Sequence, residues 1–347
     1  MSSRLVFAYP GDIGTRTGGY GYDRRAIAML GDLGWTVEWM SLGEGFPNPD
    51  AGQLEAAGRR LSDLNDGTLV LIDGLAFGVM DAWANREAGR LKVVALVHHP
   101  LALETGLAEN RKAELNTREK AALSKTRGVI VTSQTTAAEL VAHYAVPEER
   151  IVVAIPGMDP APLAAGGGDP PLILSVGTLT RRKGHDVLIE ALERLRNLSW
   201  TCRIVGSKSL DADIASELER QISGLGLGDR IELAGQIEDT RAEFAKADIF
   251  ALASRYEGYG MVFAEALAQG LPIVACAAGA VPDVVPENAG FLVPPDDPEA
   301  FAAALRRLLE EPETRVAMAD AAAIAGARLP SWRDTALIIS EFLETIS

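Results

Sequence analysis

The sequence is poor in cysteine, in aromatic residues and in positive charge. Only 2 of its 347 residues are cysteine, and 6% are aromatic. Two cysteines provide neither a disulfide framework nor a zinc-binding pattern. Cys202 and Cys276 both lie in apolar runs, so we expect buried thiols in a reducing compartment. The net charge of −15 argues against nucleic acid, and against an anionic membrane, as the main binding surface, because both need clustered lysine and arginine.

Long hydrophobic runs are also missing. No run approaches the ~18 uninterrupted apolar residues of a membrane span. Residues 1–14 lack the charged head and the long apolar region of a signal peptide. We therefore expect a cytoplasmic protein. A hydrophobic content of 48% and a charged content of 23% are typical of a soluble globular protein, and the length is sufficient for two domains.

Short apolar runs of strand length recur along the chain, with segments of helical period between many of them. They form two sets, at 5–9, 36–40, 69–72, 93–97, 129–132 and 151–155, and then at 172–176, 202–205, 231–233, 249–253, 273–276 and 291–293. Alternation of this kind predicts an α/β protein with two doubly wound parallel-sheet domains. Residues 156–171 are rich in proline and glycine, which indicates a linker. We therefore expect domains at 1–156 and 171–331, a linker at 157–170 and a C-terminal helix within 332–347.

The segment 247–276 has the order of a ligand-binding unit. An apolar run at 249–253 is followed by a glycine loop, a helical pattern at 261–269 and a second apolar run at 272–276. This order predicts strand, loop, helix and strand, with the loop at the carboxyl end of a strand, where parallel sheets bind ligands. Glu257 and Glu265 flank the backbone N–H groups that open the helix, and these groups favour a phosphate. Hydroxyls beside a central diphosphate describe a nucleotide sugar, although a glutamate pair at a helix start is also common on solvated surfaces.

The residues from Glu257 to Glu265 resemble the E-x7-E element of the retaining glycosyltransferases of family 4. That resemblance implies a GT-B fold, with two Rossmann-like domains facing a cleft and the donor mostly on the second domain. By the same analogy, the C-terminal helix at 332–347 would cross back to the first domain. Glu257 would then hold hydroxyls of the transferred sugar, and Glu265 would bind the ribose. The leaving diphosphate would be stabilised by Lys183 and by the backbone of Gly258, Tyr259, Gly260, Met261 and Val262.

The second predicted domain begins with another matching element, at 175–184. Its pattern does not meet the G-x-x-x-x-G-K requirement of a Walker loop, so ATP hydrolysis by that route is not expected. Lys183 matches the lysine of the family, and its neighbour Arg182 would also face the diphosphate. Thr178 stands where many family members have arginine. Either Arg181 or Arg182 therefore reaches the diphosphate instead, or the charge of the diphosphate is offset less fully.

Three further donor contacts are implied by the resemblance. Gly206 follows a strand-like run and would lie beneath the nucleotide, and Gln236 and Ile237 would contact the base through backbone groups. Backbone contacts do not reveal the base, so UDP, GDP and ADP all stay open.

The first predicted domain carries a glycine-rich loop after its first strand. A Rossmann dinucleotide fingerprint would need a third glycine where Arg24 stands, which argues against nicotinamide binding. In family 4, a glycine pair at this place approaches the donor diphosphate, and Gly18 and Gly19 match it. His98 ends the fourth apolar run, where the family has a histidine beside the donor sugar and the acceptor. His99 would point elsewhere if the strand geometry continues.

We therefore expect a retaining glycosyltransferase that moves a hexosyl group from a nucleotide-diphosphate sugar, with UDP- or GDP-sugars favoured. The acceptor would be a small molecule or a glycan, and the sequence specifies neither it nor the oligomeric state. His98, Lys183 and Glu257 are the expected catalytic residues. No metal and no cofactor are expected, because fixed N–H dipoles and cationic side chains can stabilise the leaving group. The alternatives are a sugar-nucleotide 2-epimerase and a non-catalytic nucleotide-sugar binding subunit.

Overall fold

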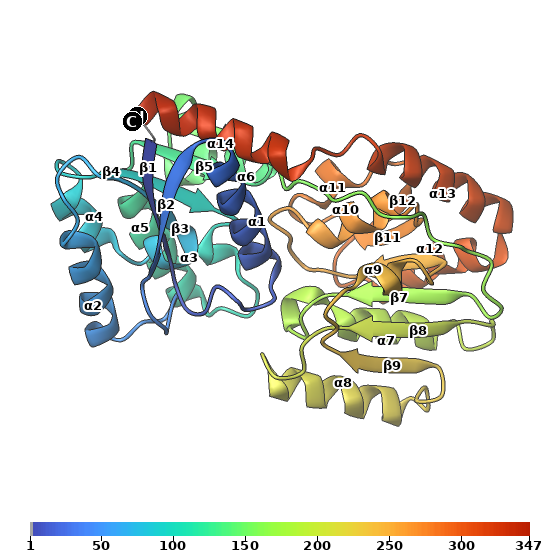
Figure 1. Cartoon of the computed structure of the whole chain (residues 1–347). Coiled ribbons are helices and arrows are strands. Elements are labelled where there is room, and N and C mark those ends of the chain that lie inside the picture. Colours follow the sequence, from blue (N-terminus) through green and yellow to red (C-terminus); the bar gives the residue numbers. More distant parts are fainter. Residues whose placement is uncertain (1–2) are drawn as a thin grey trace. The chain divides into compact units, whose positions relative to one another are not determined.

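The computed structural model describes residues 3–347, which form two compact units (Figure 1). The first unit contains the chain up to Gly157 together with Pro330–Ser347, and the second contains Met158–Leu329. Each unit holds one six-stranded parallel sheet, which confirms the predicted fold class of two doubly wound halves. No helix within the described residues is both long enough and apolar enough to cross a bilayer.

The sheet of the first unit has the strand order β2-β1-β3-β4-β5-β6. Its strands are β1 (Ser3–Tyr9), β2 (Trp35–Ser41), β3 (Leu69–Asp73), β4 (Lys92–Val97), β5 (Gly128–Val131) and β6 (Ile151–Val153). The central strands β3 and β5 are buried along their whole length, as expected for strands covered on both faces. Apolar runs therefore predicted these strands well, because burial on both faces removes the alternation of polar side chains.

Helices connect these strands and cover the sheet. They are α1 (Gly18–Asp32), α2 (Ala51–Ser62), α3 (Gly74–Phe77), α4 (Asp81–Glu87), α5 (Glu109–Leu123) and α6 (Gln134–Tyr144), with short 3-10 turns η1 (Leu101–Leu103) and η2 (Glu148–Arg150). The glycine pair Gly18 and Gly19 begins α1 and does not lie in a loop, which corrects the expectation from sequence. Thr17 explains the difference, because its side chain accepts a hydrogen bond from Tyr20 N and caps the helix.

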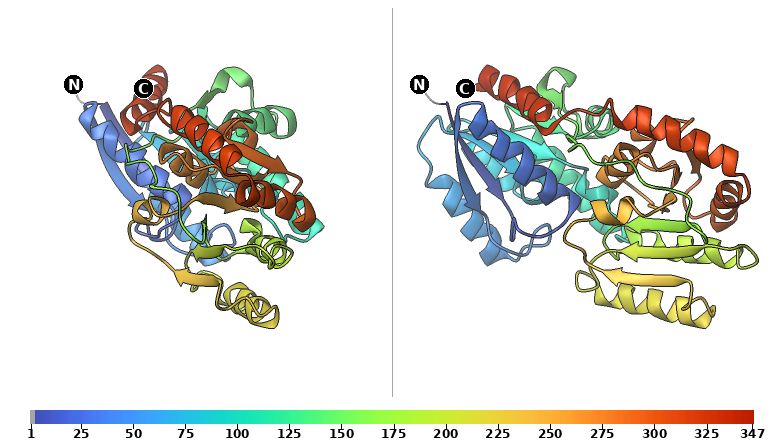
Figure 2. Two further views of the ribbon diagram at one scale, coloured as in Figure 1. Left: turned by 90° about the vertical axis from the view of Figure 1, so that its right-hand side faces the viewer. Right: turned by 45° about the vertical axis from the view of Figure 1, so that its right-hand side comes forward.

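The C-terminal helix α14 (Trp332–Ile346) packs on the first unit, next to α1 and β6 (Figure 2). Its hydroxyl groups bond to that unit at two points: Thr335 Oγ1 donates to Ile155 O at 2.8 Å, and Trp35 Nε1 donates to Ser340 Oγ at 2.8 Å. Gly128 leaves space for the ring of Phe342, which a Cβ at that position would approach to 2.4 Å. The last helix in sequence is therefore part of the first folded unit.

The second unit has the strand order β12-β11-β10-β7-β8-β9. Its strands are β7 (Leu172–Val176), β8 (Thr201–Val205), β9 (Ile231–Gly235), β10 (Ile249–Leu252), β11 (Ile273–Cys276) and β12 (Gly290–Val293). The helices are α7 (His185–Glu193), α8 (Ala212–Gly224), α9 (Arg241–Phe244), α10 (Met261–Ala268), α11 (Val281–Val284), α12 (Pro298–Glu310) and α13 (Pro312–Gly326), and a 3-10 turn η3 (Arg181–Lys183) precedes α7. The strand order places the carboxyl ends of β7 and β10 side by side at the middle of the sheet.

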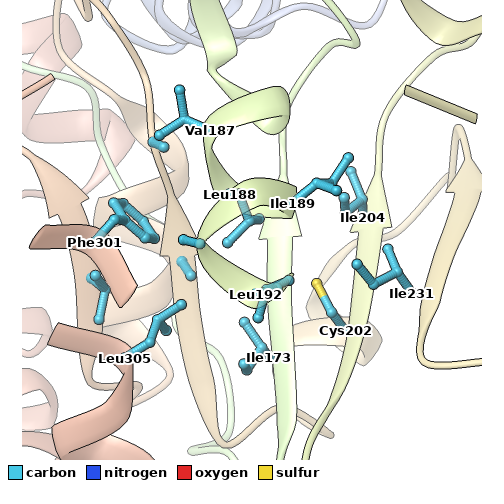
Figure 3. Packing of buried hydrophobic residues seen from close by; sticks show 14 of the residues in the cluster. Ile173, Val187, Leu188, Ile189, Leu192, Cys202, Ile204, Ile231, Phe301 and Leu305 are labelled. Atoms are coloured by element: carbon cyan, nitrogen blue, oxygen red, sulfur yellow. The ribbon is translucent and has the colours of Figure 1, made fainter. Parts of the chain in front are cut away.

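The core of the second unit lies between this sheet and the helices α7, α8 and α12. Leu188 and Leu192 of α7 pack over Ile173, and Phe301 and Leu305 of α12 lie beside them (Figure 3). All five side chains are fully buried. Burial of a large apolar side chain stabilises a fold by about 1.5–3 kcal/mol, so this layer fixes α7 on the sheet and thereby the turn η3 in front of it.

Candidate functional site

A glycine-containing loop joins the buried strand β10 to helix α10 in the second unit. The helix begins after Gly260, whose φ of +89° favours glycine. Behind the loop, Ala280 N donates to Glu257 O at 2.9 Å. Gly279 permits that approach, because a Cβ there would lie 2.2 Å from the same carbonyl oxygen. The first amides of α10 are thereby held at the carboxyl edge of the sheet, an arrangement that favours an anion.

Glu257 is a buried carboxylate surrounded by donors and positive charge. Lys183 Nζ donates to Oε1 at 2.6 Å, Ser254 Oγ donates to the same oxygen at 2.6 Å, and Arg182 lies 3.4 Å from Oε2. Burial alone would raise the pKa of Glu257, but the charges of Lys183 and Arg182 together with the hydrogen bonds outweigh it and lower the pKa to about 2. Glu257 is therefore an anion at neutral pH, held between two cations.

The turn η3 brings Lys183 to this carboxylate. Gly184 ends the turn with a φ of +62°, and a Cβ there would lie 1.9 Å from Ala253 O, so the turn can approach β10 this closely only with glycine. The stem of Lys183 packs over Gly177, at 3.3 Å from where a Cβ of that glycine would lie. Two glycines thus set the path of the lysine.

The two arginines of the turn have different partners. Arg182 donates to Tyr256 O at 3.0 Å and lies beside Glu257. Arg181 pairs with the exposed Glu217 at 2.9 Å. The structure therefore places Arg182, and not Arg181, at the Glu257 cluster, while Thr178 is a partly buried neutral residue on the adjoining loop.

Sequence reasoning missed Arg255, which connects three segments around the site through hydrogen bonds. Its guanidinium donates to both carboxylate oxygens of Asp186, at 3.0 and 2.8 Å, and to Asp296 at 2.7 Å. Its backbone N donates to Arg182 O at 2.7 Å. Arg255 therefore ties η3, the start of α7 and the loop before Glu257 together. Asp186 lies 69 residues away in sequence, so no local pattern indicated the pair.

The remaining predicted donor-binding residues of the second unit lie near the same sheet edge. Gly206 follows β8, and its N–H donates to Gly235 O at 3.0 Å; a Cβ on it would lie 1.9 Å from Gly177 O. Gln236 is exposed and Ile237 is partly buried, both directly after β9. On α10, Met261, Val262 and Glu265 are partly buried, whereas Gly258 and Tyr259 in the loop are buried.

In the first unit, His98 follows β4 and lies against the start of α1. A Cβ on Gly19 would meet His98 Cδ2 at 3.3 Å, so the glycine leaves room for the imidazole. His98 Nε2 lies 3.0 Å from Asp23 Oδ1, and the ring of Tyr22 meets the imidazole edge-on at 5.4 Å. Burial would lower the pKa of His98, but the charge and hydrogen bond of Asp23, with a smaller contribution of Asp73, outweigh it, and the net shift is upward. Sequence reasoning missed Asp23, because the pair spans 75 residues.

The neighbouring His99 has a different environment. Its Nε2 lies 3.6 Å from Glu104 Oε2, on the loop that follows β4. The two histidines therefore contact different side chains, and only His98 lies beside the glycine pair.

Two family models together match most of the chain. The model of the glycosyl transferases group 1 matches residues 165–324, and that of glycosyltransferase family 4 matches residues 43–162. A D-inositol 3-phosphate glycosyltransferase of Xylanimonas cellulosilytica is 32% identical over 285 residues, which cover 73% of this chain and 68% of the relative. Its namesake from Corynebacterium efficiens is 31% identical, covering 74% of this chain and 66% of the relative. The chain thus spans about two thirds of the length of these relatives.

Solved structures share the fold over nearly the whole chain. A sucrose-phosphate synthase of Thermosynechococcus elongatus matches with a TM-score of 0.83 at 22% identity, covering 99% of this chain and 98% of the other. HepE of Anabaena, in complex with UDP and glucose, matches with a TM-score of 0.79 at 19% identity, covering 99% and 100%. Taken with the family models and the relatives, the chain belongs to glycosyltransferase group 1 and family 4, with a GT-B-like fold, and is an enzyme of the class that uses nucleotide sugars.

Proposed function

We propose that this enzyme transfers a hexosyl group from a UDP- or GDP-sugar to a small-molecule or glycan acceptor, with retention of anomeric configuration and without a divalent metal. The observation that carries the proposal is the buried anion Glu257, held by Lys183 and Arg182 at the first amides of α10. Cations and oriented N–H groups in one place are what a departing diphosphate requires.

The ion pair defines how the donor would enter. The diphosphate of the donor competes with Glu257 for Lys183 and Arg182, because it offers the cations more negative charge. Glu257 then accepts hydrogen bonds from hydroxyls of the transferred sugar. The bond between C1 and the diphosphate oxygen breaks, the acceptor oxygen bonds to C1 on the same face, and the acceptor proton passes to the departing diphosphate.

Other residues bind the rest of the donor. Glu265 on α10 accepts from the ribose, and Gly206, Gln236 and Ile237 line the nucleotide at the ends of β8 and β9. In the first unit, the backbone at Gly18 and Gly19 approaches the diphosphate, and His98 acts on the sugar or the acceptor. The second unit is therefore the donor-binding domain, and the first carries the acceptor-side residues.

The relatives supply a starting set of substrates. HepE of Anabaena was solved with UDP and glucose, which favours UDP-glucose as the first donor to test. The relatives of highest identity reported above are named D-inositol 3-phosphate glycosyltransferases, which makes inositol phosphate a rational first acceptor.

Thermal-shift titration with UDP, GDP and ADP tests the donor site, and nucleoside diphosphate release with each matching sugar nucleotide tests transfer. We expect one nucleotide to raise the melting temperature of the wild type, and product formation in EDTA that disappears in Glu257→Ala. NMR of the product should show the anomer of the donor. Failure of all three nucleotides to bind, or loss of turnover in EDTA, would contradict the proposal.

A reaction without acceptor separates transfer from the epimerase alternative. A transferase leaves the sugar configuration of the donor unchanged or hydrolyses it slowly, whereas an epimerase isomerises it. An isomerised sugar nucleotide in the absence of acceptor would therefore replace the proposed activity with epimerisation.

A further inference from the structure

Two buried carboxyl groups lie beside His98 in the first unit. Asp23 of α1 has no exposed surface, and Asp73 at the end of β3 is 3% exposed. One carboxylate oxygen from each aspartate and one ring nitrogen of His98 all lie within 4.8 Å of one another. Asp23 lies on α1, Asp73 ends β3 and His98 follows β4, and β3 and β4 are neighbours in the sheet.

The oxygen atoms of this group are unequally satisfied. Asp73 Oδ1 accepts from Leu75 N at 2.6 Å and caps α3, and Asp23 Oδ1 lies 3.0 Å from His98 Nε2. Within residues 3–347, Asp23 Oδ2 is one of two fully buried side-chain oxygens for which no hydrogen-bond partner exists. A buried oxygen of this kind destabilises the fold unless a donor bonds to it.

A proton on Asp73 would remove the repulsion between the two carboxylates and would also provide a donor for Asp23 Oδ2. Two adjacent carboxylates in a dry site repel each other, so one of them retains its proton. Burial and then the charge of Asp23 raise the pKa of Asp73 well above its ordinary value, while the nearby His98 opposes this. The O–H of a protonated Asp73 can also donate to Asp23 Oδ2, which gives the buried oxygen its missing partner.

We propose that Asp73 carries a proton at neutral pH and donates it in a hydrogen bond to Asp23, so that Asp23 is the single anion that orients His98. Asp73 is then a positioning residue. It fixes Asp23, which in turn holds Nε2–H of His98 and leaves Nδ1 as the nitrogen that meets substrate. The inference deepens the role given to His98 in the proposed function and rests on it only for that last step.

Two neighbouring tyrosines do not supply the donor that Asp23 Oδ2 lacks. Tyr22 packs edge-on against His98, and its hydroxyl donates to Ala154 O at 2.8 Å. Tyr20 donates to Pro10 O at 2.8 Å, and burial followed by Asp73 and Asp23 raises its pKa, with smaller effects of Glu44 and Asp12. Both tyrosines therefore stay neutral, and their hydroxyl protons are already directed to backbone carbonyls.

An NMR titration of the His98 imidazole tests the charge of Asp73 without any need for turnover. Asn in place of Asp73 keeps an acceptor for Leu75 N and a donor for Asp23. We therefore expect Asp73→Asn to move the His98 titration midpoint by less than about 0.3 of a pH unit, because a neutral group replaces a neutral group. Asp23→Asn should lower the midpoint by about one pH unit or more, because it removes the anion.

A matched control is Asp50→Asn, which changes an exposed helix cap whose Oδ1 accepts from Gln53 N at 2.8 Å and should leave His98 unchanged. A fall of about one pH unit or more in Asp73→Asn would overturn the proposal, since Asp73 would then be a second anion. Stoichiometric broadening of the His98 resonance by added Mn²⁺ would also overturn it, because a cation would then supply the missing partner.

Turnover provides a second measurement. We expect Asp73→Ala to lower kcat by about tenfold or more with little change in the KM of the donor, and Asp73→Asn to restore most of it. Equal losses in the two variants would overturn the proposal, because a donor at this position would then be of no use. If no sugar nucleotide is turned over at all, the proposed function fails, while the NMR result still decides the charge of Asp73.

Discussion

Each unit buries a carboxyl group near the carboxyl end of a central strand, Glu257 after β10 and Asp73 as the last residue of β3, but they compensate for the burial in opposite ways. In the second unit, Glu257 is matched by Lys183 and Arg182, and its pKa falls to about 2. In the first unit, burial and the charge of Asp23 raise the pKa of Asp73, and burial raises that of Glu119 to about 8. Burial alone therefore does not set the charge of an acid; its partners do.

The difference suits what each unit is proposed to bind. A diphosphate is stabilised by cations. In the second unit, Lys183 and Arg182 pair with Glu257, and the diphosphate of the donor would compete with this acid for them. In the first unit, the proposed proton on Asp73 serves to fix Asp23 and through it His98, the residue proposed to act on the sugar or the acceptor. The following predictions test this comparison, from the largest expected effect to the smallest.

Lys183→Met should lower kcat by about 100-fold or more, because it removes a partly buried cation from the leaving diphosphate. The neighbouring Arg181→Ala is the matched control and should change turnover by about threefold or less, since Arg181 pairs with an exposed glutamate. Steady-state release of the nucleoside diphosphate measures both. Similar losses in the two variants would show that the turn acts only through its total charge.

Glu257→Gln should destabilise the protein by about 2 kcal/mol near neutral pH, because two partly buried cations lose their buried anion. The lowered pKa means that Glu257 contributes this stability above its ordinary pKa of 4.5, and that the contribution disappears as the pH falls toward about 2. Urea unfolding of both proteins at several pH values measures the difference. A difference in unfolding free energy between the two proteins that stays constant through the acid range would mean that Glu257 is not held as an anion.

Glu119→Gln should show the opposite pH dependence. Glu119 Oε2 accepts from Leu101 N at 2.9 Å, and Oε1 is buried without a partner among the described residues. Because its folded pKa is raised to about 8, the wild type loses stability as the pH rises from about 4.5 through about 8.

Glutamine cannot ionise, so Glu119→Gln should become more stable than the wild type by about 2 kcal/mol at the alkaline end of this range. At acidic pH the two proteins should be similar. Urea unfolding again provides the measurement. A variant that is less stable than the wild type by the same amount at every pH would show that burial does not raise the pKa of Glu119.

Thr178→Arg should have the smallest effect. It places an arginine where many members of the family have one, next to a cluster that already contains Lys183 and Arg182. We expect the affinity for the nucleoside diphosphate to rise by about threefold, the size of one partly exposed charge interaction. Isothermal titration measures it, and a weaker affinity would indicate that Arg182 already fills the available position.

Much of the fold could be predicted from local sequence. The apolar runs located all the strands, and the spacing in 332–346 matched the bounds of α14, because residues buried on one face or both follow the period of their element. The one local error concerned Gly18 and Gly19, where glycine content indicated a loop but the cap at Thr17 allowed a helix to begin.

The candidate site was predicted less completely. The resemblance named His98, Lys183 and Glu257, but not what holds them. Lys183 and Glu257 lie 74 residues apart and are in contact only because β7 and β10 are neighbours in the sheet. No periodicity in the sequence encodes such a contact.

By itself, the sequence determined the alternation of buried strands and covering helices, since apolar periodicity is a property of consecutive residues. Tertiary structure decided which acids are anions, because the charge of a buried carboxyl depends on groups brought to it from distant strands. Glu257 lies beside two cations, whereas Asp73 lies beside another acid.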